Sequence, residues 1–177
     1  MSTTTVEDQL AEVRRRIDRL QALAQLDGAE ERLRIQRHLD ALHQEEASVA
    51  AAARSAPDEV EEKLGRLKTR LVVAEHSVAA DVSDDWATFS AAVEGELRCW
   101  DNYLERLQTS VAAKAWKARE QAEAAIGDVR TRRLAIDERL AQARAATGDA
   151  WQEQRKRVTA ARDELEQKAA ELSTKLK

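Results

Sequence analysis

The residues whose types could support chemistry gather in one short stretch. His38, Asp40, His43, Glu45 and Glu46 fall within nine consecutive positions. Asp40 and His43 have the acid-x-x-His spacing of di-metal carboxylate bundles, but such a site needs a second copy of that motif and two further carboxylates. The chain has no second copy, and its two neighbouring histidines are five residues apart, not the four that place two ligands on one helical face. We therefore expect solvated histidines, no metal ion and no other cofactor.

Aromatic residues recur at helical spacing later in the chain. Trp86 and Trp100 are fourteen residues apart, which is two heptads, and Phe89 and Tyr103 share their predicted face. Such a stripe is typical of a core or an interface rather than of a ligand-binding box. The sequence places no base beside Cys99, and it lacks a glycine-rich phosphate loop, a serine-centred elbow and a Cys-x-x-Cys pair. It thus predicts a protein that is not an enzyme and has no catalytic residues.

The composition indicates that helices position the functional surface of the protein. Charged residues make up 35% of the 177 positions and aromatic residues 3%, with five glycines and one proline. A mixture rich in Ala, Arg, Glu and Leu is typical of long helices and coiled coils, so we expect an all-α fold. The sequence has no apolar run of about 18 residues, no secretory signal pattern and one cysteine. These features favour a cytoplasmic location.

Apolar residues in the first two-thirds of the chain pair with a constant sum. Ten of them up to position 53 have apolar counterparts from 60 to 107, and each pair of numbers adds up to 113. A constant sum predicts one antiparallel helical hairpin, with its turn at 55–57, where Pro57 suits the first turn of a helix. The pairs are Val6 with Leu107, Leu10 with Tyr103, Val13 with Trp100, Leu20 with Val93, Ala24 with Phe89, Ile35 with Val78, Leu39 with Ala74, Leu42 with Leu71, Val49 with Leu64 and Ala53 with Val60.

Two architectures satisfy this pattern. The heptad rhythm slips by one residue near Gly28 and again near Ser83, and the two slips face each other in the same register. If the helices run straight through both points, long antiparallel arms form a coiled coil, with a middle helix over 57–146. If both arms break there, shorter helices form a compact four-helix bundle. The matched slips leave both alternatives open.

A second constant sum, 294, occurs in the last third of the chain. It pairs Ile136 with Val158 and Val129 with Leu165, around a turn signal at 147–149. The predicted domains are therefore a helical hairpin over 1–110 and a second helical hairpin over 111–177.

Several apolar residues lie beside these seams rather than in them. They include Leu23, Leu33 and Leu134. A stripe wider than a two-helix seam needs further helices to cover it, so we expect a homodimer. The interface candidates are Leu97, Leu104, Trp116, Trp86 and Trp100. The alternative is an intramolecular bundle in which these residues are ordinary core.

The charge distribution is uneven along the chain. Residues 1–101 carry a net charge of −8 and residues 102–177 carry +4, for a total of −4. Opposite signs could align neighbouring molecules or bring the ends of one molecule together. Basic clusters such as Arg14–Arg16 are surrounded by acids, which disfavours binding to nucleic acid. Mixed charges on the polar faces also disfavour, but do not exclude, attachment to a membrane surface.

The C-terminal run TGDAWQEQRKRVTAARDELEQKAAELSTKLK resembles a group of small bacterial coiled-coil proteins that are described as stress-associated. In that group a Ser/Thr-Gly-Asp-Ala-Trp turn leads into a helix, and a second Trp stands where this chain has Arg162. The segment 83–107 looks like a looser second copy, which suggests a tandem repeat. The matching residues of the C-terminal run are Gly148, Asp149, Trp151, Val158, Ala161, Asp163, Glu164 and Leu165.

The resemblance implies a helical bacterial protein with a role in stress, but no reaction and no ligand. Together with the composition and the seams, it predicts a non-enzymatic helical scaffold or protein-interaction protein. Such a protein would act through self-association or through binding an unknown protein partner. The alternative prediction is a peripheral, amphipathic helical protein of lipid or membrane surfaces.

Overall fold

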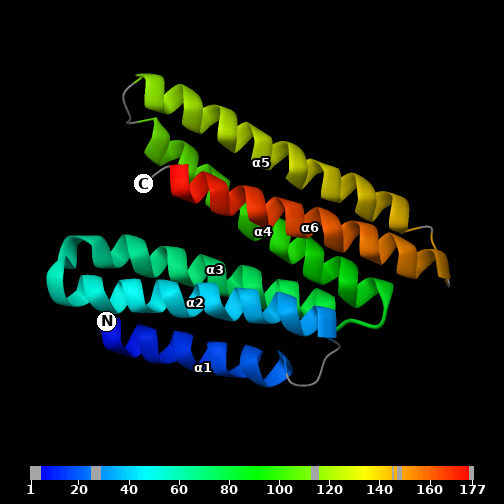
Figure 1. Cartoon of the computed structure of the whole chain (residues 1–177), viewed down its shortest axis with the longest axis horizontal. Coiled ribbons are helices and arrows are strands. Elements are labelled where there is room, and N and C mark those ends of the chain that lie inside the picture. The colour runs from blue at the N-terminus through cyan, green and yellow to red at the C-terminus, as the bar shows by residue number, and fades with distance from the viewer. Residues whose placement is uncertain (1–4, 25–28, 113–115, 145, 147–148, 176–177) are drawn as a thin grey trace. The chain divides into compact units, whose positions relative to one another are not determined.

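The computed structural model describes residues 5–24, 29–112, 116–144, 146 and 149–175. Over these ranges the chain forms helices and contains no β-strand (Figure 1). The prediction of an all-α helical bundle is therefore confirmed. The elements are α1 (Val6–Ala24), α2 (Ala29–Ser55), the 3-10 turn η1 (Pro57–Glu59), α3 (Val60–Asp81), α4 (Trp86–Val111), α5 (Trp116–Ala143) and α6 (Asp149–Lys175).

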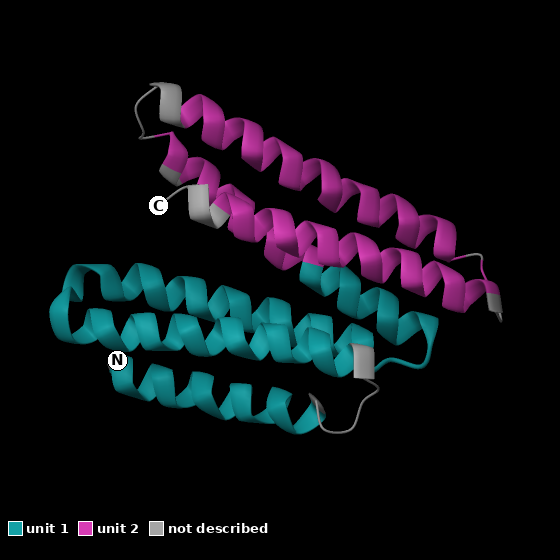
Figure 2. Cartoon of the chain, in the orientation of Figure 1, with its two compact units in different colours: residues 1–96 teal, residues 97–177 magenta. Residues whose placement is uncertain are grey.

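The chain divides into two compact units (Figure 2). Unit 1 comprises residues 1–96 and unit 2 comprises residues 97–177, so that the boundary falls inside α4. The boundary at 110/111 predicted from the sequence instead coincides with the end of α4. Of the two predicted turns, 55–57 separates α2 from α3, and 147–149 falls between α5 and α6, although residues 147 and 148 lie outside the described residues.

The centre of unit 1 is the antiparallel hairpin of α2 and α3. The two helices are packed together along their length, and the apolar residues predicted to form their seam are buried apart from Ala53, which is exposed. The buried residues are Ile35, Leu39, Leu42 and Val49 on α2 and Val60, Leu64, Leu71, Ala74 and Val78 on α3. Pro57 begins the 3-10 turn directly after α2, where its fixed φ suits the start of a helix. This part of the constant-sum pattern is confirmed.

Helix α1 packs elsewhere than that pattern predicts. It lies against α2 and α3 (Figure 1), and its buried stripe joins the same core as theirs. Arg16 forms an ion pair with Glu75, and Lys68 donates to Gln9. Both pairs are separated by 59 positions, so α1 runs parallel to α3. The predicted pairing of the α1 seam with residues 89–107 of α4 is wrong, because α1 ends at Ala24 and a new helix begins at Ala29.

The second break occurs between α3 and α4. Helix α3 ends at Asp81 and α4 begins at Trp86. The Ser83 hydroxyl donates to the Ala80 carbonyl at 2.7 Å, and Asp85 caps α4 by accepting from the Thr88 backbone N–H at 2.9 Å. The straight arms and the middle helix over 57–146 are therefore wrong, and the helices end and begin again near Gly28 and Ser83 as the alternative predicts. The compact four-helix bundle of that alternative stays a prediction.

Unit 2 is built on the hairpin of α5 and α6. The two helices are packed together. Of the residues paired by the sum of 294, which also pairs Ala122 with Leu172 and Ala143 with Trp151, Trp151 is half-buried and the others are buried: Ala122, Val129, Ile136, Ala143, Val158, Leu165 and Leu172. Polar contacts attach the second half of α4 to α5, since Arg133 pairs with Asp101 at 2.8 Å and Arg130 donates to Gln108 at 2.6 Å. Neither Gly95 in α4 nor Gly127 in α5 interrupts its helix.

Candidate functional site

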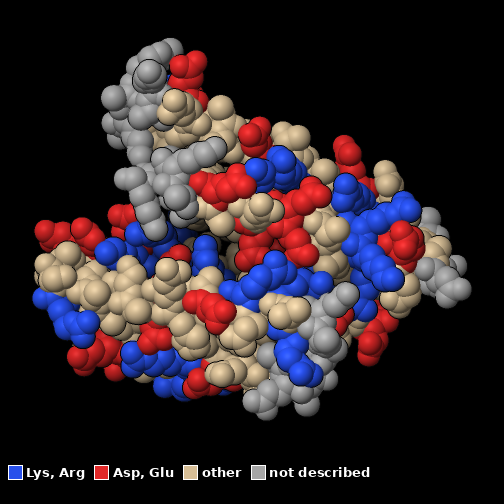
Figure 3. Space-filling model, viewed as in Figure 1, with Lys and Arg blue, Asp and Glu red and all other residues tan. Residues whose placement is uncertain are grey.

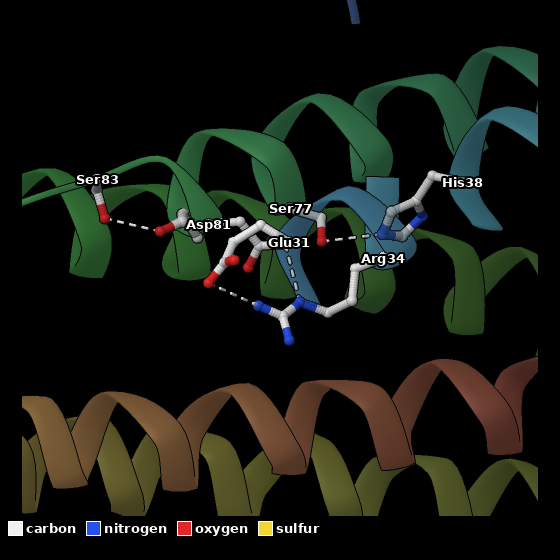
Figure 4. Close-up of polar contacts among 7 residues, drawn as sticks. Glu31, Arg34, His38, Ser77, Asp81 and Ser83 are labelled. Carbon is white, nitrogen blue, oxygen red and sulfur yellow. Dashed lines mark hydrogen bonds and ion pairs between the residues drawn. The ribbon is translucent and has the colours of Figure 1, made fainter. Parts of the chain in front are cut away.

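A row of polar pairs joins α2 to α3 beside their apolar seam. His38 Nε2 is hydrogen-bonded to Ser77 Oγ at 3.0 Å, and Arg34 Nε pairs with Asp81 Oδ2 at 3.1 Å (Figure 4). Further along the hairpin, Arg70 Nε lies 3.4 Å from Glu45 Oε1. In each pair the two residue numbers add up to 115. This row, which we call the polar seam, has a constant sum of its own, two higher than that of the apolar seam, and it likewise requires an antiparallel hairpin.

The ion pair at one end of the polar seam is largely removed from water. The Asp81 side chain is 1% exposed and that of Arg34 is 17% exposed. Arg34 also approaches Glu31 at 3.8 Å. Asp81 is the last residue of α3, where the helix dipole disfavours a negative charge. Arg34 therefore compensates both the burial of this carboxylate and its position.

The distance between His38 and Ser77 would suit a base and its nucleophile. However, Ser77 is 4% exposed and His38 is 5% exposed, so no substrate can reach the hydroxyl in this state. We interpret the pair as a structural contact within the hairpin. Sequence reasoning missed it, because the sum of 113 places Glu75 rather than Ser77 opposite His38.

The stretch at 38–46 does not form the kind of site that its composition suggests. His38 points toward α3, whereas Asp40 is exposed and accepts from Gln36 at 2.8 Å. His43 is exposed beside Glu46, at 3.7 Å. The prediction of solvated histidines is therefore confirmed for His43 and wrong for His38. Among the described residues, no three His, Cys, Asp or Glu side chains gather closely enough to hold a metal ion.

The five predicted interface residues lie in different environments. Leu97, Trp100 and Leu104 are buried within the chain, and Trp86 is half-buried. The side chain of Trp116 lies outside the described residues. Trp100 packs edge-on against Tyr103, with ring centroids 5.8 Å apart, and Trp86 lies 6.4 Å from Phe89. The burial of these residues within one chain agrees with the alternative in which they are ordinary core. Their role in contacting a second chain stays a prediction.

Other apolar residues predicted to lie beside the seams do reach the surface. Leu33 on α2 is 68% exposed, Leu134 on α5 is 57% exposed and Leu23 on α1 is 39% exposed. A hydrogen bond between Trp86 and Asp27 is another expectation from the sequence, but Asp27 lies outside the described residues.

The first half of α4 approaches α3 closely at one glycine. A Cβ atom built on Gly95 would lie 2.4 Å from His76 Cε1 and 2.5 Å from His76 Nδ1. Only a residue without a side chain lets the imidazole occupy this place. Gly95 therefore positions His76 between the two helices, and neither residue was singled out for this contact from the sequence.

The two units carry charges of opposite sign. Unit 1 contains 12 Lys and Arg and 20 Asp and Glu, a net charge of −8, and unit 2 contains 17 and 13, a net charge of +4. Lys and Arg side chains gather over the end of the α5–α6 hairpin in Figure 3. No described helix is both long enough and apolar enough to cross a membrane.

Comparisons with known proteins do not place the chain in a family. No protein-family model, no curated protein and no solved structure matches it.

Proposed function

We propose that the protein is a non-enzymatic helical scaffold of the cytoplasm, which acts by binding a second copy of itself or another protein. The resemblance of its C-terminal run to stress-associated coiled-coil proteins supports a role in the response to stress. In this proposal the buried seams give each unit a defined shape, and the outer faces of the helices make the contacts.

The observation that carries the proposal is the exposure of two leucines on helices whose other described Leu, Ile and Val side chains are buried. Leu33 and Leu134 are 68% and 57% exposed. A partner that covers such a leucine stabilises the complex by about 25 cal/mol for each Å² of apolar surface removed from water. One leucine lies in each unit, so each unit offers an apolar anchor to a partner.

Sedimentation equilibrium of the whole chain tests self-association. We expect a dimer at micromolar concentrations, and a variant with Leu33→Ser and Leu134→Ser should dissociate more readily while keeping its helical content. A matched control, Gln44→Ser, changes another exposed residue of α2 and should leave the association unchanged. A wild-type chain that stays monomeric at high micromolar concentration would rule out the self-associating scaffold.

Co-sedimentation with lipid vesicles tests the alternative of a membrane-surface protein. A scaffold should stay in the supernatant with both neutral and anionic vesicles. Pelleting with either would favour the lipid-binding alternative.

A further inference from the structure

A concentration of positive charge in unit 2 lies at the end of the α5–α6 hairpin. Five basic residues contribute to it, and we call this surface the basic end. It comprises Arg139, Arg144, Arg155, Lys156 and Arg157. Over the same stretch, from Glu138 to Arg157, the acidic residues are Glu138, Asp149 and Glu153. The basic end therefore carries a clear excess of positive charge.

Contacts between the helices hold the basic end in place. Arg139 Nη1 on α5 donates to the Arg157 carbonyl on α6 at 3.1 Å, and Arg157 Nε pairs with Glu153 at 3.3 Å. Arg144 and Lys156 are exposed. Arg139 is thus fixed across the hairpin, the Arg157 side chain is held within α6, and the exposed side chains of Arg144 and Lys156 are accessible to a partner.

Unit 1 offers the complementary charge. Its segment 81–96 contains five acidic residues and no Lys or Arg. Asp84, Asp85 and Glu94 are exposed, and no described ion pair joins any of these three to a basic side chain. The segment 81–96 is therefore an acidic surface of unit 1 that could bind the basic end of another copy, in agreement with the net charges of −8 and +4.

We propose that the basic end of unit 2 docks on the acidic segment 81–96 of a second copy of the chain, in a head-to-tail contact. The inference rests on the proposed function, because it adds a charged contact to the self-association that the exposed leucines anchor. Complementary charges raise the rate of encounter and fix the orientation of the partners. They are screened by salt, with a Debye length of about 10 Å at 0.1 M.

Sedimentation velocity as a function of salt and protein concentration tests this contact. Raising NaCl from about 50 mM to about 300 mM should weaken the association by roughly tenfold. A double variant, Arg144→Glu with Lys156→Glu, should remain monomeric at the concentration where the wild type associates. The control Arg19→Glu with Arg54→Glu makes the same change in net charge on exposed residues of unit 1 and should not weaken the association.

A charge swap distinguishes docking from a general effect of net charge. The variant with Asp84→Lys and Glu94→Lys should also be monomeric alone, whereas an equal mixture of the two double variants should associate again. An association that is insensitive to salt and to these changes would overturn the head-to-tail contact and leave the scaffold intact, whereas a monomer under all conditions would overturn both. Loss of binding to duplex DNA in the Arg144/Lys156 variant, with no effect on self-association, would assign the basic end to nucleic acid instead.

Discussion

His38 on α2 and Ser77 on α3 form a hydrogen bond of 3.0 Å, with both residues buried beside an apolar seam. Antiparallel helices with Leu, Val and Ala at their contacts can slide past each other by a turn and still bury apolar surface. A slide of one turn would separate the His38 imidazole from the Ser77 hydroxyl, and both groups would then be buried without their hydrogen bond. The pair therefore favours one register of the hairpin over its neighbours.

Replacing Ser77 by alanine should lower the free energy of unfolding by about 1–3 kcal/mol, because the hydrogen bond to the buried His38 is lost. Urea unfolding followed by circular dichroism measures the change. The matched control is Ser48→Ala, at an exposed position of α2, which should have little effect. Equal midpoints for the two variants would show that the hydrogen bond contributes nothing to stability.

Removing the Arg34 side chain should lower the free energy of unfolding more than removing an exposed arginine side chain does. In an Arg34→Met variant the Asp81 carboxylate loses its ion pair while its side chain stays buried, and breaking a buried pair typically costs about 3–5 kcal/mol. The double variant with Asp81→Leu should recover much of this loss. Arg15→Met removes an exposed pair with Glu12 and should leave the urea midpoint almost unchanged. Similar losses in the two single variants would contradict the role given to Arg34.

Glycine to alanine substitutions in α4 and α5 should have opposite effects. At Gly127 an added Cβ meets nothing within 4 Å, so alanine should stabilise the helix by about 0.5–1 kcal/mol. At Gly95 the same atom would collide with the ring of His76, so His76 must leave its place and the variant should be less stable than the wild type. The melting temperatures of the two variants and the wild type, measured by thermal unfolding, test both expectations.

The second variant that tests this explanation is Gly95→Ala combined with His76→Ala. It should be more stable than Gly95→Ala alone, because the colliding ring is removed. If the single Gly95 variant gains stability like the Gly127 variant, the imidazole does not need this glycine.

The sequence determines some of these relationships and leaves others open. An antiparallel hairpin with a short turn imposes a constant sum on its contacts, so Ile35 and Val78 could be paired from periodicity alone. The position of α1 could not, because an apolar stripe such as Leu10 and Val13 fits any helix with a matching stripe. The heptad pattern does not show whether the chain after Ala24 continues in the direction of α1 or folds back against it.

The same limit explains why the predicted interface residues turned out to lie in different environments. Interface residues were sought among apolar positions beside the seam, and Leu97 and Leu104 are instead buried in the chain. In a bundle, a residue beside one seam can lie in the next, and a one-dimensional pattern cannot tell that position from an outer face. Leu33 and Leu134 have the same pattern and do face the solvent.

Acid should weaken the start of α4 through its capping residue. Hydrogen bonds from the Thr88 backbone N–H and hydroxyl hold the pKa of Asp85 below its usual value of 3.8. A carboxyl whose pKa is lower in the folded state stabilises that state above the unfolded pKa, and the stabilisation is lost as the pH falls through the folded value. Asp85→Ala should therefore reduce the melting temperature at neutral pH, and the difference from the wild type should shrink below about pH 4. Melting temperatures between about pH 2 and pH 7 measure this, with Asp84→Ala as an exposed neighbour that caps no helix among the described contacts. A difference between wild type and Asp85→Ala that stays constant across this range would mean that the ionised carboxylate is not what stabilises the cap.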